Sequence, residues 1–242
     1  MRLAIIPARG GSKRIPRKNI LPFRGQHIIH YAIRAALESG CFDEVMVSTD
    51  DAEIASIARA AGASVPFMRN PQTADDITST ATVIREVLTE YQSLGRHFTV
   101  ACCLYATAVL VTPARLRQAA MMLDTYPETE GVITVVRTPQ PAVRALVVKD
   151  GQVAFMLADQ ITSRSQDYSE TYFDAAQMYW LRTAPFLARD EPTMSFLKRL
   201  PLVLSEFETQ DINTQEDWQL AEWKHLFLEE HPEILQTGNI AS

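Results

Sequence analysis

Cysteine and histidine are scarce, and their spacing suits neither a set of disulfides nor a zinc site. Only Cys41, Cys102 and Cys103 occur in 242 residues, which is too few for a disulfide framework. Cys102 and Cys103 are adjacent inside an apolar run, so we expect them in the core. No set of cysteines and histidines has the spacing of a zinc site. The sequence therefore excludes disulfide-rich domains and zinc-centred folds.

Long apolar runs are also absent. No stretch approaches the roughly 18–20 apolar residues that cross a bilayer, and the first residues lack the apolar stretch of a secretory signal. We therefore expect a cytoplasmic protein that does not use a membrane. The net charge of −6 argues against nucleic acid as a partner. The length suits a single domain over residues 1–242.

Strands and helices alternate along the first half of the chain. Short apolar runs predict strands at 3–6, 45–48, 64–67, 98–104 and 131–136. Between them, helical spacing and capping residues predict helices at 28–37, around 54–58, at 79–94 and at 112–126. This alternation is typical of the α/β class and predicts a doubly wound, mostly parallel sheet.

The pattern changes after Pro139. Two short runs flank Asp150-Gly151 and predict a hairpin over 145–149 and 152–156. Further strands are predicted at 174–181 and near 202–205. Thr214 and Asp217 form a capping box for a last helix. We interpret 139–175 as a small β-rich insertion, either a lid or a dimer contact.

A basic loop follows the first predicted strand. Residues 6–19 read I-P-A-R-G-G-S-K-R-I-P-R-K-N, and five of the chain's 23 cations fall within ten of these residues. Glycines let the backbone approach a ligand and aim successive N–H groups at an anion, while arginine matches phosphate oxygens. The loop contains neither a P-loop motif nor the glycine fingerprint of a dinucleotide site, which makes an NAD-dependent oxidoreductase a distant alternative.

With only position 14 free, this string resembles the signature of the sugar-acid cytidylyltransferases, the CMP-sialic acid synthetases and their relatives. The resemblance implies a fold of the nucleotide-diphospho-sugar transferase type, a homodimer, and Mg²⁺ as cofactor. It also implies that the loop wraps the CTP triphosphate through Ala8, Arg9, Gly10, Gly11, Ser12, Lys13, Lys18 and Asn19.

A second segment resembles the part of the family that holds cytosine. Arg69, Thr78 and Thr80 fall on its base-contacting positions. The run Thr78-Ser79-Thr80 would serve equally well as a helix cap, and both roles can coexist. Asp50 and Asp51 receive no chemical role, because a helix cap explains them as well as the family's acidic turn does.

The segments that resemble the sugar-binding part of the family lie further along the chain. R-S-Q-D at 164–167, followed by D-A-A-Q-M-Y-W at 174–180, looks like the pseudaminic acid branch. An acidic sugar needs a cation for its carboxylate and polar groups for its amides and hydroxyls, which Arg164, Gln166, Asp174 and Gln177 would supply. Ala176 replaces the glycine that is usual in this motif.

The metal motif also departs from the family. Relatives carry Asp-x-Asp before the last helix, whereas this chain has Asp211 and Asn213. Asparagine still offers a neutral oxygen to Mg²⁺, which needs only one or two carboxylates. Ala106 likewise stands where relatives have a proline.

The predicted reaction joins CTP and an acidic nine-carbon sugar, pseudaminic acid by preference, with release of pyrophosphate. Arg9, Lys18 and Asp211 are the predicted catalytic residues, with Asp211 and Asn213 holding the metal. Two alternatives stay open. One is a CMP-sialic or CMP-legionaminic acid synthetase, and the other is a CTP-binding protein that the changes at positions 106, 176 and 213 have impaired.

Overall fold

A six-stranded mixed sheet forms the centre of the molecule. The computed structural model describes residues 1–74, 77–160, 168–194 and 198–236. The strand order is β10-β6-β9-β5-β1-β4, and only β9 runs antiparallel to its two neighbours. The sheet comprises β1 (Arg2–Pro7), β4 (Glu44–Ser48), β5 (Val100–Leu104), β6 (Gly131–Arg137), β9 (Tyr172–Arg182) and β10 (Arg199–Leu204). The predicted mostly parallel α/β sheet is confirmed.

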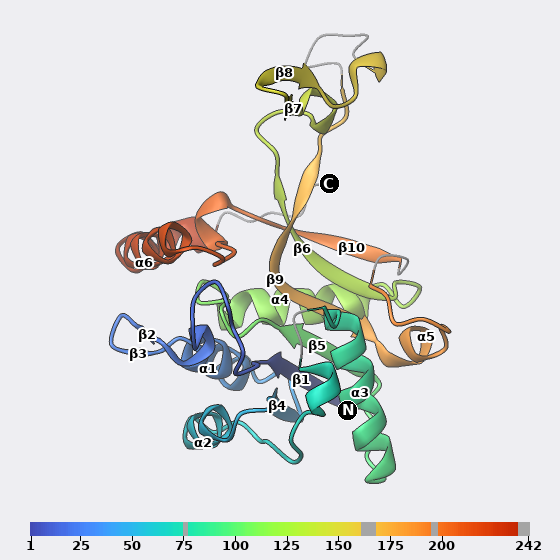
Figure 1. Ribbon diagram of the computed structural model, residues 1–242. Coiled ribbons are helices and arrows are strands. Elements are labelled where there is room, and N and C mark those ends of the chain that lie inside the picture. The colour runs from blue at the N-terminus through green and yellow to red at the C-terminus, as the bar shows by residue number, and fades with distance from the viewer. Residues whose placement is uncertain (75–76, 161–167, 195–197, 237–242) are drawn as a thin grey trace.

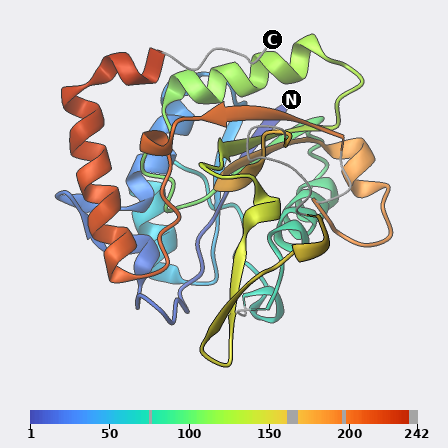
Figure 2. The ribbon, with the colours of Figure 1, turned by 90° about the horizontal axis from the view of Figure 1, so that it is seen from above.

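Helices cover both faces of this sheet (Figures 1 and 2). Successive side chains of a strand point to opposite faces, so Ala4 and Ile6 of β1 join one core while Leu3 and Ile5 join the other. The first core is closed by α1 (Ile29–Ser39), α2 (Ala52–Ala60) and α4 (Pro113–Thr125). The second is closed by α3 (Thr80–Ser93) and α5 (Thr183–Leu187).

The predicted strand at 64–67 is wrong. This segment makes a single parallel bridge, between Ser64 and Met46. The Ser64 N–H donates to Val45 O at 2.8 Å, and the Val47 N–H donates to Ser64 O at 2.9 Å. Pro66 follows two residues later and has no N–H, so the ladder cannot continue.

An arm projects from the sheet. The strands β6 and β9 run beyond the helical layers, and the arm ends in the hairpin of β7 (Leu146–Lys149) and β8 (Gln152–Phe155) (Figure 1, top). This confirms the predicted hairpin. Its apolar side chains are exposed, with Val148 at 73% and Val153 at 64%. The hairpin therefore adds nothing to the core of its own chain.

The last helix, α6 (Gln215–Glu230), packs on a third apolar cluster beside the basic loop. Thr214 and Asp217 form the predicted capping box. After His231, Pro232–Gln236 forms a short 3-10 helix, η7, whose Ile234 and Leu235 pack on this cluster. Among the described residues, no helix is long and apolar enough to cross a membrane.

Candidate active site

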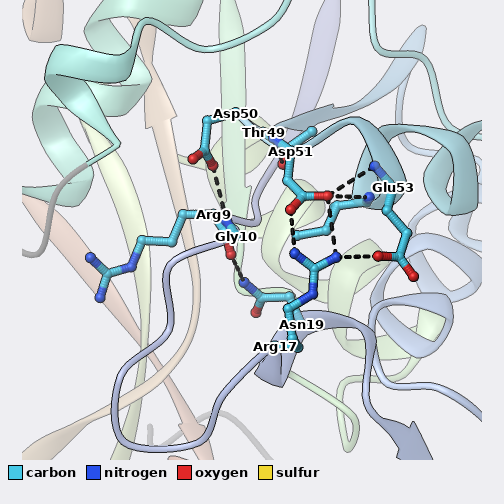
Figure 3. Close-up of polar contacts among 9 residues, drawn as sticks. Arg9, Gly10, Arg17, Asn19, Thr49, Asp50, Asp51 and Glu53 are labelled. Carbon is cyan, nitrogen blue, oxygen red and sulfur yellow. Dashed lines mark hydrogen bonds and ion pairs between the residues drawn. The ribbon is translucent and has the colours of Figure 1, made fainter.

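The basic loop leaves β1 at the carboxyl edge of the sheet, where open α/β sheets bind ligands. Its main chain is fixed at three points. The Ala8 N–H donates to Ser48 O at 2.9 Å, and the Gly10 N–H donates to Asp50 Oδ1 at 3.0 Å. The Asn19 amide donates to Arg9 O at 3.0 Å across the loop (Figure 3). The loop is therefore shaped by contacts that do not require a ligand.

The two glycines of the loop have different physical roles. A Cβ on Gly10 would lie 2.7 Å from Asp51 Oδ2, so only glycine fits against the start of α2. A Cβ on Gly11 would meet no atom within 4 Å. Packing within the protein therefore requires glycine at position 10 but not at position 11.

Arg17 holds the far side of the loop. Its guanidinium pairs with Asp51 and Glu53 (Figure 3), and its backbone is left-handed with φ 57°. Asp51 also caps α2 by accepting from the N–H groups of Glu53 and Ile54. The hydrogen bond from Arg17 lowers the pKa of the Asp51 carboxyl. Asp50 and Asp51, which the sequence explained only as caps, thus also shape the basic loop.

A cavity of about 640 Å³ opens between this loop, the start of α3 and the segment before α6. Its lining includes most of the predicted nucleotide and metal residues, namely Arg9, Ser12, Lys13, Lys18, Asn19, Arg69, Thr78, Thr80, Asp211 and Asn213. Ala8, Gly10 and Gly11 are not among the lining residues; Ala8 is buried and Gly11 is exposed. The topology thus gathers residues as far apart in the sequence as Arg9 and Asn213.

Lys18 bridges two walls of this cavity. Its ammonium donates to Ile212 O, in the segment that carries Asp211. Burial lowers the pKa of Lys18, and the nearby Asp211 carboxylate opposes that shift. Lys18 therefore joins the basic loop to the predicted metal residues.

Two of the residues predicted to contact cytosine form hydrogen bonds within the protein. The buried Arg69 donates from Nε to Ser48 Oγ at 3.0 Å and from Nη2 to Ser48 O at 2.7 Å, and its burial lowers its pKa. Thr80 Oγ1 lies 3.1 Å from the Tyr105 hydroxyl. The cap of α3 is Ser79, which leaves Thr78 and Thr80 on the cavity wall.

Residues 208–213, which we name the metal segment, are held from several sides. Glu208 is buried and makes a two-pronged ion pair with Arg115 of α4, at 2.7 and 3.0 Å. The Lys224 ammonium donates to Thr209 O at 2.7 Å. At the other end, the Asn213 N–H donates to Asp217 Oδ2 at 2.9 Å. Asp211 thus projects from a rigid support.

Asp211 and Asn213 suit a hard cation. Both line the cavity, and the Asn213 amide nitrogen donates to Asp211 Oδ2. One carboxylate with one amide oxygen, completed by substrate phosphates and water, is a donor set that Mg²⁺ accepts. To offer its oxygen, the Asn213 amide has to turn over. The part of the chain that the structure describes contains no group of three or more His, Cys, Asp or Glu side chains arranged for a metal.

The four residues predicted to bind the sugar differ in where they lie. Arg164 and Gln166 lie outside the described residues. Asp174 is exposed and accepts from the Ala176 N–H and the Tyr179 hydroxyl, both at 2.9 Å. Gln177 is 1% exposed and does not line the cavity. Gln177 therefore stands behind the wall on which a sugar would rest.

Ala176 takes the place of the family's glycine in a bulge of β9. Between Ile133 and Val135 of β6 the register jumps from Tyr179 to Asp174. Ala176 lies in this bulge with φ 50°, a left-handed conformation that favours glycine, and lines the cavity. The departure from glycine thus carries backbone strain at the cavity wall.

A cationic loop that faces a carboxylate–amide pair across a cavity suits transfer of a nucleotidyl group, and sequence comparison places the chain in the class of nucleotidyltransferases. The chain belongs to the cytidylyltransferase family, whose model matches residues 3–238. A pseudaminic acid cytidylyltransferase of Campylobacter jejuni is 39% identical over 78% of this chain and 81% of its own length. A second, from another strain, is 36% identical over 90% and 94%.

A further relative belongs to the same class of enzyme, and a solved structure shares the fold. A CMP-N,N'-diacetyllegionaminic acid synthase of Legionella pneumophila is 29% identical over 91% of this chain and 94% of its own. Among solved structures, a CMP:2-keto-3-deoxy-manno-octonic acid synthetase complexed with CTP superposes with a TM-score of 0.67. It covers 95% of this chain and 99% of its own at 18% identity, which establishes the shared fold alone.

Proposed function

We propose that this cytidylyltransferase joins CTP to pseudaminic acid, forming the CMP-activated sugar and pyrophosphate. The observation that carries the proposal is the similarity to two pseudaminic acid cytidylyltransferases over most of both chains. The cavity supports it, because a cationic loop and a carboxylate–amide pair face each other across it.

In this proposal the basic loop binds the triphosphate. Arg9, Lys13 and Lys18 supply positive charge, and arginine adds a planar fork that matches phosphate oxygens. The main chain at Ala8, Gly10 and Gly11, with Ser12 and Asn19, shapes the cradle. Arg69, Thr78 and Thr80 lie on the adjoining wall, where cytosine would rest.

Asp211 and Asn213 would hold Mg²⁺ beside the phosphates. A bound Mg²⁺ would neutralise phosphate charge and act as a Lewis acid at the α-phosphate. Lys18 keeps the metal segment against the basic loop, since it donates to Ile212 O. The chain thereby sets where the metal-bearing carboxylate stands relative to the triphosphate cradle.

The transfer itself is an in-line substitution. The sugar's anomeric hydroxyl loses its proton to water as its oxygen bonds to the α-phosphorus, while the bond from that phosphorus to the bridging oxygen breaks and pyrophosphate leaves. The chain contributes positioning and charge neutralisation rather than covalent chemistry. The bulge at 174–178 faces the acceptor in this proposal, and Arg164 and Gln166 remain predicted sugar contacts.

The test is pyrophosphate release from CTP and Mg²⁺ with pseudaminic, sialic and legionaminic acids supplied separately. We expect release with pseudaminic acid at least tenfold faster than with the others, and no release from Asp211→Ala. Faster release with sialic or legionaminic acid would retain the reaction and reject the substrate. CTP binding without release from any acid would support the impaired alternative, for which the Asn213 replacement is the specific observation.

We also propose that the arm pairs with a second copy of the chain. Exposed apolar side chains gather on and beside the hairpin, namely Leu146, Val148, Val153, Phe155, Met156 and Phe173. A contiguous exposed apolar surface of this kind marks an interface. Light scattering should find a dimer that Val153→Lys dissociates and that Leu94→Lys, an exposed leucine at the end of α3, leaves intact.

A further inference from the structure

Two segments from distant parts of the sequence form adjoining walls of the cavity. One is the bulge of β9 at 174–178, which contributes Ala176. The other is the metal segment, which contributes Asp211. In the proposed reaction the first faces the sugar and the second holds the metal. Their spacing therefore decides how the acceptor hydroxyl meets the α-phosphate.

Two buried side chains connect these walls. The Thr209 hydroxyl donates to Ala175 O at 2.8 Å. The Gln177 amide donates to the same Ala175 oxygen at 3.1 Å and also reaches Gln210 O at 3.4 Å. Thr209 belongs to the metal segment and Gln177 to the bulge, so each donates across the junction. Both are buried, and their contacts are screened from water.

Each wall also has anchors of its own. The bulge is held by the contact from the Ala176 N–H to Asp174 and by the Thr134 hydroxyl, which donates to Met178 O at 3.3 Å. The metal segment is held by Arg115 and Lys224. Among the described residues, the hydrogen bonds of Thr209 and Gln177 join the two walls to each other.

We propose that Thr209 and Gln177 are positioning residues that set the distance between the acceptor wall and Asp211. The inference rests on the proposed function and adds that the acceptor wall and the metal segment are coupled. Gln177 thereby acts on the sugar through the backbone of the bulge rather than by touching it. Reaction rates are sensitive to such spacing, because a misplacement of about 1 Å can cost 10²-fold.

Thr209→Val tests the link, and Thr134→Val is its matched control. Both remove a buried threonine hydroxyl that donates to the bulge, but only Thr209 reaches it from the metal segment. For Thr209→Val we expect the KM for the sugar and the Mg²⁺ concentration at half-maximal rate each to rise about threefold to tenfold, as for the loss of one hydrogen bond. The KM for CTP should change less than twofold. Thr134→Val should leave the Mg²⁺ dependence unchanged.

Hydrogen exchange gives a readout that needs no turnover. Thr209→Val should speed amide exchange in 174–178 and in 209–213 together, whereas Thr134→Val should speed it in 174–178 alone. If Thr209→Val does not fold, Gln177→Met should give the same pattern. Equal exchange and kinetic profiles for the two threonine variants would overturn the proposal. A wild type that releases no pyrophosphate would reject the proposed function, while the exchange data would still decide whether the walls are coupled.

Discussion

The metal segment and the hairpin of the arm are built in opposite ways. Along 208–213, contacts arrive from α4, α6, β9 and the basic loop, and the acidic side chain of Glu208 is 2% exposed against Arg115. The hairpin keeps Val148 and Val153 in solvent, and none of its residues belongs to the apolar clusters of the described part of the chain. The fold surrounds the first region with contacts, whereas it leaves apolar side chains of the second exposed.

The difference between the two regions shows which side chains have to be held in a fixed position. A carboxylate that acts on a phosphate has to be held in place before the substrate arrives, which requires a second layer of hydrogen bonds behind it. An association surface needs only apolar area and a shape that its partner can match. Changes in the metal segment should therefore alter chemistry and stability, while changes in the hairpin should alter assembly.

The largest effect should come from Asp211→Asn. This change keeps the size of the side chain and removes its charge, so we expect kcat to fall about 10³-fold, as when one preorganised electrostatic contact is lost. Because Asp211 is exposed, the free energy of unfolding in urea should stay within about 0.5 kcal/mol of wild type. A variant that keeps a tenth of the wild-type kcat would remove Asp211 from the reaction.

Arg115→Met should have the next largest effect, on stability. It would leave the Glu208 carboxylate buried without its charged partner, which costs about 3–5 kcal/mol. Urea unfolding would measure the loss. The control is Arg2→Met, which breaks the exposed pair with Asp124 and should cost less than about 1 kcal/mol. Similar losses in both variants would mean that the metal segment does not depend on this buried pair.

Ala176→Gly should stabilise the protein slightly. Left-handed backbone disfavours a Cβ by about 1–2 kcal/mol, and the greater freedom of glycine in the unfolded chain offsets part of that gain. We expect a net increase of about 0.5–1 kcal/mol in the free energy of unfolding. The control, Ala154→Gly on the exposed strand β8, should give no gain. A loss at position 176 would show that the methyl group packs usefully in the cavity wall.

The smallest effect should be on how the free energy of unfolding depends on pH, through the basic loop. Arg17 lowers the pKa of Asp51, so this carboxyl contributes stability above its unfolded pKa and loses it as the pH falls through its folded pKa. The contribution should be below about 1 kcal/mol, because Arg17 is more than a third exposed. Between pH 5 and pH 3, urea unfolding should show a larger loss for wild type than for Asp51→Asn. Equal losses would contradict the role given to Arg17.

Local signals in the sequence predicted much of this structure. The basic loop after a buried strand, the caps Asp51 and Thr112, and the box at Thr214 each depend on residues close together in the chain. The family signature then brought the loop and Asp211 into one site. Local patterns were therefore enough for most of the helices and strands, and the family resemblance supplied the grouping of the basic loop with Asp211, which line one cavity.

Long-range contacts could not be predicted in the same way. Nothing local indicates that Asp50 accepts from Gly10, or that Thr209 reaches the backbone of β9. Gln177 has the chemistry of a sugar contact, yet the register jump in β9 buries it behind the wall. In each of these cases the deciding partner lies in a distant part of the sequence. The failed strand at 64–67 differs, because Pro66, whose missing N–H ends the ladder, is itself part of the predicted segment.

The most direct test of the central claim is calorimetric titration of CTP into wild type and Asp211→Asn, with and without Mg²⁺. If the basic loop and the metal segment form one preorganised CTP site, wild type should bind CTP, and Mg²⁺ should tighten binding at least tenfold. In Asp211→Asn, Mg²⁺ should tighten it less than threefold while CTP alone still binds. No CTP binding to wild type, or an equal effect of Mg²⁺ on both proteins, would contradict this account.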